Sequence, residues 1–406
     1  MSPSKSAGSE HSQLDLVKDL LVLSAGGLIS LLIIGRIVSH VLDPSFASEF
    51  VNHSRLLPQL ERAGAPLYSI WYLLQKLIVG SDLSENVLIA SGIFLLGALA
   101  MLKGVILTGL LRSAFFSPLV SLIGGVLLGT AVALPIPFLQ RTSPMIGGVT
   151  RYLGTIPANT FMSATQLVAN LAAVIAFVAV QLWMRSPSRQ SYGLMIVVSF
   201  IATMAKPGIA LPLLFGIFSS IALSVHRSRG IIKPYSLQLI LPALCLGLPI
   251  LIIQHTYYGA SRWQGLKAVL NPMHTWQAFS NQIPLDFVAS IAFPLIVLLM
   301  LFLQLRNSEC TESKECLLGL IPAWVTFISA LAIFILFAET MHGSIVTPGN
   351  FIWGAISSNS GLHVVSFIAL KQFSPRMRII PIIILFLEAA CGYIYCTNYA
   401  ATGVYF

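Results

Sequence analysis

Asp43 directly follows the first long apolar segment of the chain, at the start of a loop that extends to about Glu85. This loop is much longer than the few residues that usually join two helices. A carboxylate at the edge of a membrane has two interpretations. It is either a helix cap, since Asp43-Pro44 is a favourable helix N-terminus, or a general base that takes a proton from an acceptor hydroxyl group. We expect Asp43 to be catalytic.

Two arginines lie on either side of a Gly-Gly pair in a later polar segment. Arg151 is followed directly by Tyr152-Leu153-Gly154, and Arg141 precedes the glycines by several residues. Guanidinium groups on a glycine-containing loop hold phosphate through paired hydrogen bonds, which lysine does less well. We expect Arg151 and Tyr152 to bind substrate and Arg141 to contact lipid headgroups.

Polar side chains recur at helical spacing around the start of the next apolar segment. They are Asn159, Ser163, Gln166 and Asn170. This spacing predicts a shared polar face on a membrane helix. Such a face either forms hydrogen bonds to neighbouring helices or lines a hydrophilic cavity, in which Asn159 would contact substrate oxygen atoms.

Two further charged residues lie in or beside apolar segments. Lys206 either extends to the membrane interface or neutralises a substrate phosphate as a point charge. Glu388 lies inside the last apolar segment and requires a cation or a proton. Lys103 and Lys206 are its candidate partners.

The segment from Glu339 to Trp353 is the last polar one. Glu339 and His342 form an i, i+3 pair that can orient the imidazole, and a structural loop contact is the alternative for His342. We include Asn350 and Trp353 with them as substrate-binding candidates. No metal-ligand spacing is present, so we expect no metal site, and the sequence identifies no cofactor.

The chain that positions these residues is strongly apolar. It is 56% hydrophobic and 9% charged, with a mean hydropathy of +0.86, which excludes a soluble globular protein. We predict an all-α, polytopic integral membrane protein with about eleven transmembrane helices. It would have a cytoplasmic segment over residues 1–19 and one transmembrane domain over residues 20–406. The predicted spans lie near residues 20–41, 86–111, 114–138, 161–184, 191–206, 207–225, 236–256, 287–305, 317–338, 352–370 and 379–396.

The distribution of basic residues predicts the orientation. The net charge is +9. If the N-terminus is cytoplasmic, the inner loops hold about twice as many Lys and Arg residues as the outer ones, as the positive-inside rule expects. The charge is therefore a topology signal and does not indicate nucleic-acid binding. All polar segments described above then face the extracytoplasmic side of a plasma (inner) membrane.

The first external loop contains a segment that is too short to cross a bilayer. Residues 65–80 begin with a proline-led aromatic stretch and contain Lys76. We expect this segment to lie along the outer face of the membrane as an interfacial helix. Tyr68, Trp71 and Tyr72 would then lie at the level of the lipid headgroups.

Three stretches of the sequence together carry a family resemblance. They are Tyr152-Leu153-Gly154 with Pro157-Ala158-Asn159-Thr160-Phe161-Met162-Ser163-Ala164-Thr165, then Ala205-Lys206-Pro207-Gly208, and finally Gly349-Asn350-Phe351-Ile352-Trp353-Gly354. This set resembles a family of polytopic bacterial membrane proteins of exopolysaccharide and cell-envelope glycan synthesis, and the overall arrangement is similar to GT-C glycosyltransferases. Met162 and Ala164 stand where the family pattern has histidine and proline, and the first loop lacks paired acids.

The resemblance implies transfer or polymerisation of a sugar from a polyprenyl-phosphate-linked donor to a growing glycan outside the membrane. Asp43 would be the base, Arg151 and Lys206 would hold the lipid phosphate, and Asn159 would position sugar or phosphate oxygen atoms. The expected partners are the lipid-linked donor, the glycan acceptor, the lipid bilayer and possible subunits of a glycan synthesis complex. The alternatives are a flippase or transporter of lipid-linked oligosaccharide and a non-catalytic scaffold of such a complex.

We predict that the two ends of the chain lie on opposite sides of the membrane, with the N-terminus in the cytoplasm. The physical reason is the excess of Lys and Arg in the loops assigned to the inside. Single cysteines introduced at the two ends of a cysteine-free variant should react with an impermeant maleimide from opposite sides. Reaction of both ends from the same side would contradict this topology.

Overall fold

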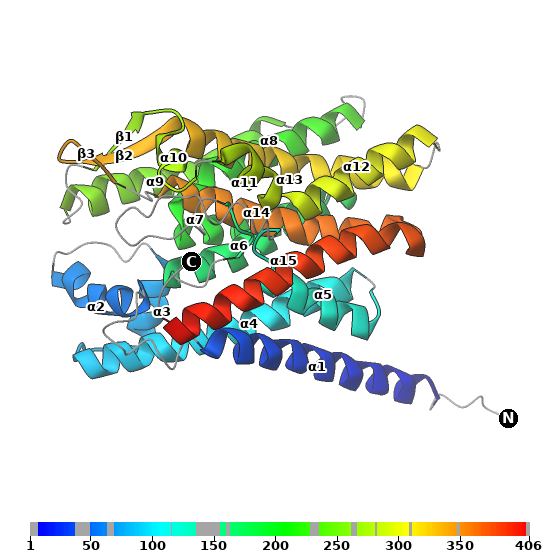
Figure 1. Cartoon of the computed structure of the whole chain (residues 1–406), viewed down its shortest axis with the longest axis horizontal. Coiled ribbons are helices and arrows are strands. Elements are labelled where there is room, and N and C mark those ends of the chain that lie inside the picture. Colours follow the sequence, from blue (N-terminus) through cyan, green and yellow to red (C-terminus); the bar gives the residue numbers. More distant parts are fainter. Residues whose placement is uncertain are drawn as a thin grey trace.

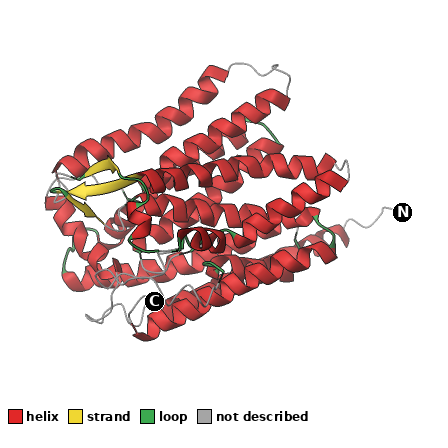
Figure 2. Ribbon diagram, turned by 45° about the horizontal axis from the view of Figure 1, so that its top comes forward, coloured by secondary structure: helices red, strands yellow, loops and turns green. Residues whose placement is uncertain are grey.

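A computed structural model describes most of the chain, with gaps in several loops. The described residues are 7–36, 49–62, 69–114, 116–134, 155–159, 163–227, 235–260, 266–280, 282–307, 311–346 and 350–402. They form a bundle of long helices that run roughly parallel or antiparallel to one another (Figure 1), with one small sheet at an end of the bundle (Figure 2).

Each apolar segment predicted from the sequence contains a helix. Three of the predicted spans differ clearly from the structure: α1 begins at Ala7 rather than near residue 20, α5 is shorter than its predicted span, and a bend divides the span near residues 287–305. The helices are α1 (Ala7–Ile34), α4 (Glu85–Ser113), α5 (Pro118–Thr130), α6 (Ala164–Arg185), α7 (Arg189–Ala205), α8 (Ala210–Arg227), α9 (Tyr235–Ala260), α11 (Ile283–Ser290), α12 (Ala292–Asn307), α13 (Thr311–Leu336), α14 (Phe351–Ala369) and α15 (Pro375–Thr402).

The helical membrane class is confirmed. Among the described residues, six helices are long and apolar enough to cross a membrane, and a seventh span results if α11 and α12 count as one. These two helices meet at a bend of 70°. Eleven complete crossings stay a prediction.

The described helix ends next to the loops predicted as inner and outer lie at opposite ends of the bundle (Figure 1). Helix α1 begins at one end and α15 finishes at the other (Figure 1). At the end where α1 begins, Arg112 forms an ion pair of 2.7 Å with Asp19, and the Lys371 ammonium donates to the Ala114 carbonyl at 3.2 Å. The sheet, α2 (Glu49–Arg62) and α3 (Ile70–Val79) lie at the opposite end (Figure 1).

The sheet is a departure from the all-α prediction. Strands β1 (Lys267–Leu270), β2 (Phe337–Met341) and β3 (Ser344–Val346) pair antiparallel in the order β1-β2-β3. His342 and Gly343 form the β2–β3 turn with φ angles of 53° and 83°, the left-handed region that tight hairpins favour. The strands have three to five residues, and β2 continues directly from the apolar run of α13, so no alternating pattern separates it from a helix.

The segment between α1 and α4 contains two short helices, α2 and α3. Helix α3 has ten residues, about 15 Å, and is too short to cross a bilayer. The predicted role of Trp71 and Tyr72 as anchors among the lipid headgroups is wrong, since their exposed fractions are 0% and 1%. The Tyr72 hydroxyl lies 2.6 Å from His53 Nδ1 of α2, so the aromatic face packs inward and Leu77 is exposed instead. Tyr68 lies outside the described residues.

Helices α6 and α14 form the centre of the bundle. Every residue from Ile352 to Ala369 is buried, and α6 is almost entirely buried as well. Close packing around α14 depends on glycines: a Cβ atom on Gly354 would overlap the Gly208 carbonyl oxygen, and one on Gly208 would lie 3.1 Å from the Asn350 carbonyl oxygen. Two of the stretches that carry the family resemblance are therefore in direct contact.

We predict that Gly354→Ala destabilises the protein by about 1–3 kcal/mol, because the methyl group must displace backbone atoms. The matched control is Gly193→Ala in α7, where an added Cβ meets nothing within 4 Å. The control should be neutral, or stabilised by at most about 1 kcal/mol through helix propensity. Unfolding in mixed detergent measures both changes, and equal stabilities would contradict the contact between Gly354 and Gly208.

Candidate functional site

Lys206 lies at a break between two helices. Helix α7 ends at Ala205, and Pro207 begins the 3₁₀ helix η3 (Pro207–Ile209), which leads into α8. Proline lacks an N–H group and prevents the α-helix from continuing. Lys206 itself has an extended backbone, with φ −154° and ψ 106°. The chain therefore divides at Pro207 into two helices, which frees the Lys206 side chain from a continuous helical surface.

The Lys206 ammonium contacts α14 and the start of α6. Its Nζ lies 5.2 Å from the centroid of the Trp353 ring and donates to Thr165 Oγ1 at 3.2 Å. A cation over an indole face contributes about 0.5–2 kcal/mol, depending on how far it is desolvated. Residues from three separate segments of the chain therefore meet at this half-buried lysine.

Glu339 and Asn350 form the other side of this cluster. The two carboxylate oxygens of Glu339 each accept from Asn350 Nδ2 at 3.0 Å, and Oε2 also accepts from the Asn350 backbone N–H at 2.9 Å. Asn350 is the N-cap of α14, so the carboxylate lies where the helix dipole favours negative charge. Strand β2 is thereby fastened to the first turn of α14. Lys206, Glu339, Asn350 and Trp353 are hereafter called the Lys206 cluster.

Charge and burial act in opposite directions on Glu339. Burial raises the pKa of its carboxyl group above the usual value of 4.5, while the hydrogen bonds from Asn350 and the positive charge of Lys206 oppose this shift. The exposed fraction of Glu339 is 7%. The cluster therefore combines a cation, a buried carboxyl group with a raised pKa, an amide and an indole.

A hydrogen-bond network between α6 and α14 includes the backbone carbonyl of Trp353. Gln166 Nε2 lies 3.1 Å from the Trp353 carbonyl, 2.7 Å from Asn170 Oδ1 and 2.7 Å from Ser357 Oγ. Ser357 Oγ also donates to Asn170 Oδ1 at 3.0 Å. The predicted polar face therefore joins two helices at Gln166 and Asn170. Buried Gln166 Oε1 and Asn170 Nδ2 have no hydrogen-bond partner among the described residues.

Asn159 belongs to a different group. It precedes α6, which begins at Ala164, so it does not share the helical face predicted for it. Its Oδ1 accepts from the Lys103 ammonium at 2.6 Å, and its Nδ2 donates to the carbonyls of Leu128 and Ala131 at 2.8 and 2.6 Å. All these partners lie within the bundle, so the amide of Asn159 holds the end of α5 and does not join the Lys206 cluster.

The remaining predicted site residues divide into two sets. His342 is exposed at the tip of the β2–β3 hairpin, and both carboxylate oxygens of Glu339 bond to Asn350, so the predicted orientation of His342 by Glu339 has no support in these hydrogen bonds. Asp43, Arg151 and Tyr152 lie outside the described residues. Among the described residues, no group of three His, Cys, Asp or Glu side chains could hold a metal ion.

The sequence did not indicate the buried pair of His363 and Glu388. His363 Nε2 lies 3.2 Å from Glu388 Oε2, and its Nδ1 lies 2.9 Å from the Asn359 carbonyl. The expected partner of Glu388, Lys103 or Lys206, was therefore wrong. Glu388 Oε1 also accepts from the Phe293 N–H, in the first turn of α12 beyond the 70° bend. The usable signal was a histidine inside an apolar segment, the same rule that identified Glu388.

Comparison with models of known protein families gives no match, and a search of curated proteins finds no similar sequence. The functional argument therefore depends on the geometry of the chain itself.

Glu339 should make the stability of the protein depend on pH in a defined direction. Its raised pKa means that the folded protein binds this proton more tightly than the unfolded chain does. The resulting stability is complete below pH 4.5 and declines as the pH rises from 4.5 through the raised pKa.

Glu339→Gln removes this titration. The Tm of the wild type minus the Tm of the variant should therefore decrease as the pH rises over the same range. Thermal unfolding in detergent between about pH 4 and pH 8 tests this expectation. A difference in Tm that does not change with pH would contradict it.

Proposed function

We propose that this protein is a GT-C-like membrane glycosyltransferase or polymerase. It would move a sugar from a polyprenyl-phosphate-linked donor to a growing glycan on the extracytoplasmic side of the plasma (inner) membrane. The observation that supports this proposal best is the Lys206 cluster. Within it, two stretches that resemble glycan-synthesis proteins meet each other and a buried carboxyl group.

The lysine is suited to a lipid-linked phosphate. Its ammonium is a compact positive charge that donates to Thr165 Oγ1 at 3.2 Å. The Trp353 ring fixes the position of the ammonium without supplying a full negative charge. An incoming phosphate can therefore bind Lys206 as a point charge, while Glu339 balances the charge of the lysine when no phosphate is bound.

The location also suits a donor that remains in the membrane. Lys206 lies at a helix break next to the end of the bundle that carries the sheet, α2 and α3. In the proposed topology of eleven crossings, this end faces outward. A polyprenyl chain in the outer leaflet could then present its phosphate to Lys206 without leaving the bilayer.

The chemical step in this proposal belongs to Asp43. As general base it would accept the proton of the acceptor hydroxyl as that oxygen attacks the anomeric carbon and the polyprenyl phosphate departs. Arg151 would grip the same phosphate through a bidentate fork. Tyr152 and Asn350 would contact the sugar, and no step needs a metal ion because cationic side chains carry the phosphate charge.

Purified protein in proteoliposomes, given a polyprenyl-phosphate-linked sugar and an acceptor glycan, tests the roles separately. Asp43→Asn should lower turnover by about 10²–10⁴ and leave donor binding intact, since an amide cannot accept the proton. Lys206→Gln and Arg151→Lys should instead weaken donor binding.

The matched control is Lys76→Gln. Lys76 lies in α3 at the same end of the bundle and forms an ion pair of 2.7 Å with Glu61, outside the Lys206 cluster. It should retain wild-type transfer. Normal product yield from folded Asp43→Asn and Lys206→Gln proteins would rule out the roles proposed for these two residues. Absence of product from the folded wild-type protein would contradict the enzyme and favour the scaffold.

A second candidate function is transport of lipid-linked oligosaccharide. The observation in its favour is the buried Glu388 carboxylate, which accepts from the first turn of α12 just after a 70° bend and contacts His363. Broken helices whose N-termini face an ion or substrate group, and buried ionisable residues, are typical of transporters. Movement of the labelled donor across the membrane without sugar transfer, in the assay above, would favour this function.

A further inference from the structure

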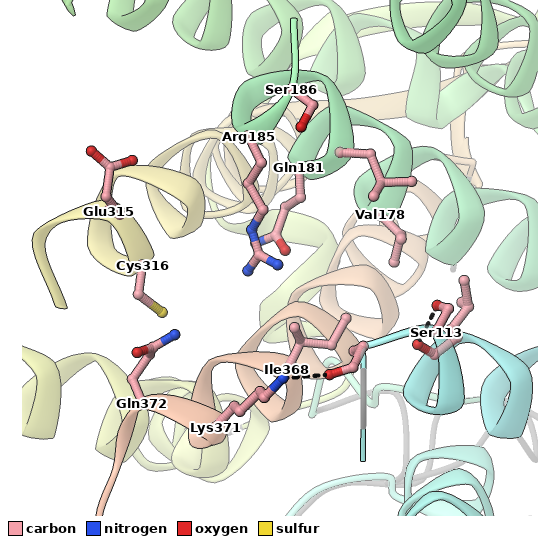
Figure 3. A pocket seen from close by; sticks show the side chains of 13 residues that line it. Ser113, Val178, Gln181, Arg185, Ser186, Glu315, Cys316, Ile368, Lys371 and Gln372 are labelled. Atoms are coloured by element: carbon pink, nitrogen blue, oxygen red, sulfur yellow. Dashed lines mark hydrogen bonds between the residues drawn. The ribbon is translucent and has the colours of Figure 1, made fainter. Parts of the chain in front are cut away.

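A cleft of about 670 Å³ lies at the end of the bundle opposite the Lys206 cluster (Figure 3). It opens between the C-terminal ends of α4 and α6, the N-terminal turns of α13, and the junction of α14 with the 3₁₀ helix η4 (Leu370–Gln372). Helix α6 has 22 residues, about 33 Å, and carries Thr165 at one end and Arg185 at the other. The cleft is therefore distinct from the proposed catalytic site and has no role in it.

The lining of this cleft is amphipathic. Leu110, Val178 and Ile368 supply apolar surface. The polar groups include two cations, one carboxylate and one amide, from Arg185, Lys371, Glu315 and Gln372. Ligand sites of small molecules typically have volumes of about 300–1,000 Å³ and combine an apolar lining with a few polar groups. The volume and lining of this cleft meet both conditions.

Two cations face each other across the cleft. Figure 3 shows the Arg185 guanidinium and the Lys371 ammonium extending from opposite walls into the space between them, with the Glu315 carboxylate turned away from Arg185. Lys371 donates to the Ala114 carbonyl at 3.2 Å. The Arg185 guanidinium forms no hydrogen bond or ion pair with any side chain or carbonyl of the described residues.

Helix dipoles offer a competing explanation for these cations. The C-terminal ends of α4 and α6 carry partial negative charge, and basic residues in a last turn stabilise it. Arg306 occupies the equivalent position in the last turn of α12 at the same end of the bundle, but outside the cleft. Both Arg185 and Arg306 can therefore stabilise the dipole of their own helix. Of the two, only Arg185 also lines the cleft and faces a second cation there.

We propose that this cleft binds the phosphate group of an anionic amphiphile. The guanidinium of Arg185 holds two phosphate oxygens through a bidentate fork, and Lys371 holds a third as a point charge. Hydrocarbon of the same ligand lies along Leu110, Val178 and Ile368. Basic pockets between membrane helices are known to take lipid headgroups. A membrane phospholipid and a soluble phosphate ester share this chemistry, and the experiment separates them.

Native mass spectrometry of the full-length protein in neutral detergent tests the site. Phosphatidylglycerol, phosphatidylcholine and inorganic phosphate are titrated separately. Phosphatidylglycerol should bind the wild type more tightly than phosphatidylcholine does, and Arg185→Gln should weaken it about tenfold, as expected for loss of a charge-assisted bond pair. Lys371→Gln should weaken it as well, and Arg306→Gln should bind as the wild type does.

Competition between inorganic phosphate and phosphatidylglycerol distinguishes a soluble phosphate ester from a membrane lipid as the ligand. If inorganic phosphate displaces phosphatidylglycerol from the wild type but binds Arg185→Gln poorly, the cleft accepts soluble phosphate esters. If it does not compete, the cleft is a lipid site that needs the hydrocarbon contacts as well.

Two results would overturn the proposal. Equal weakening by Arg185→Gln and Arg306→Gln would show only the effect of surface charge. Wild-type binding of phosphatidylglycerol by both Arg185→Gln and Lys371→Gln, with a lowered Tm, would show that the two cations only stabilise helix ends.

Discussion

Polar groups buried between α6 and α14 are the constraint on which the centre of this protein depends. Both helices are almost entirely buried, so the polar side chains along them need partners inside the bundle. Gln166, Asn170 and Ser357 form hydrogen bonds with one another, and Gln166 also donates to the Trp353 carbonyl. Gln166 Oε1 and Asn170 Nδ2 are the atoms of this group that lack a partner among the described residues. This network fixes the register of the two helices and, with it, the orientation of Trp353.

The helix break at Pro207 places Lys206 next to the fixed Trp353 side chain. It allows the Gly208 backbone to approach Gly354 closely, so that Lys206 lies over the Trp353 ring. Strand β2 then carries Glu339 to the N-cap of α14, where Asn350 binds both of its carboxylate oxygens. A proline break, a glycine contact and a strand placed on a helix N-terminus together bring a cation, an indole and a carboxyl group to one place. The proposed donor-phosphate role of Lys206 depends on all three.

Hydropathy was sufficient to predict the helices, because a membrane span requires about 20 apolar residues and leaves a strong pattern. Side-chain partners were not predictable. The Lys103–Asn159 and His363–Glu388 contacts join different segments, and nothing in the spacing of either pair specifies its partner.

Burial of aromatic residues was the other point that spacing could not decide. Trp71 and Tyr72 have the composition of interfacial anchors, but α3 packs between α2 and α4 and turns them inward. The short sheet escaped prediction for a related reason, since β2 continues the apolar run of α13. In both cases tertiary packing overrides a local preference.

The central claim is that Lys206 receives the phosphate of a polyprenyl-linked donor. Its direct measurement is the acylation rate of individual lysines by an amine-reactive reagent, followed by peptide mass spectrometry, with and without a polyprenyl-phosphate-linked sugar. The account predicts that donor slows acylation of Lys206 and leaves exposed Lys267, in β1 at the same end of the bundle, unchanged. An unchanged rate at Lys206 with saturating donor bound would contradict the account.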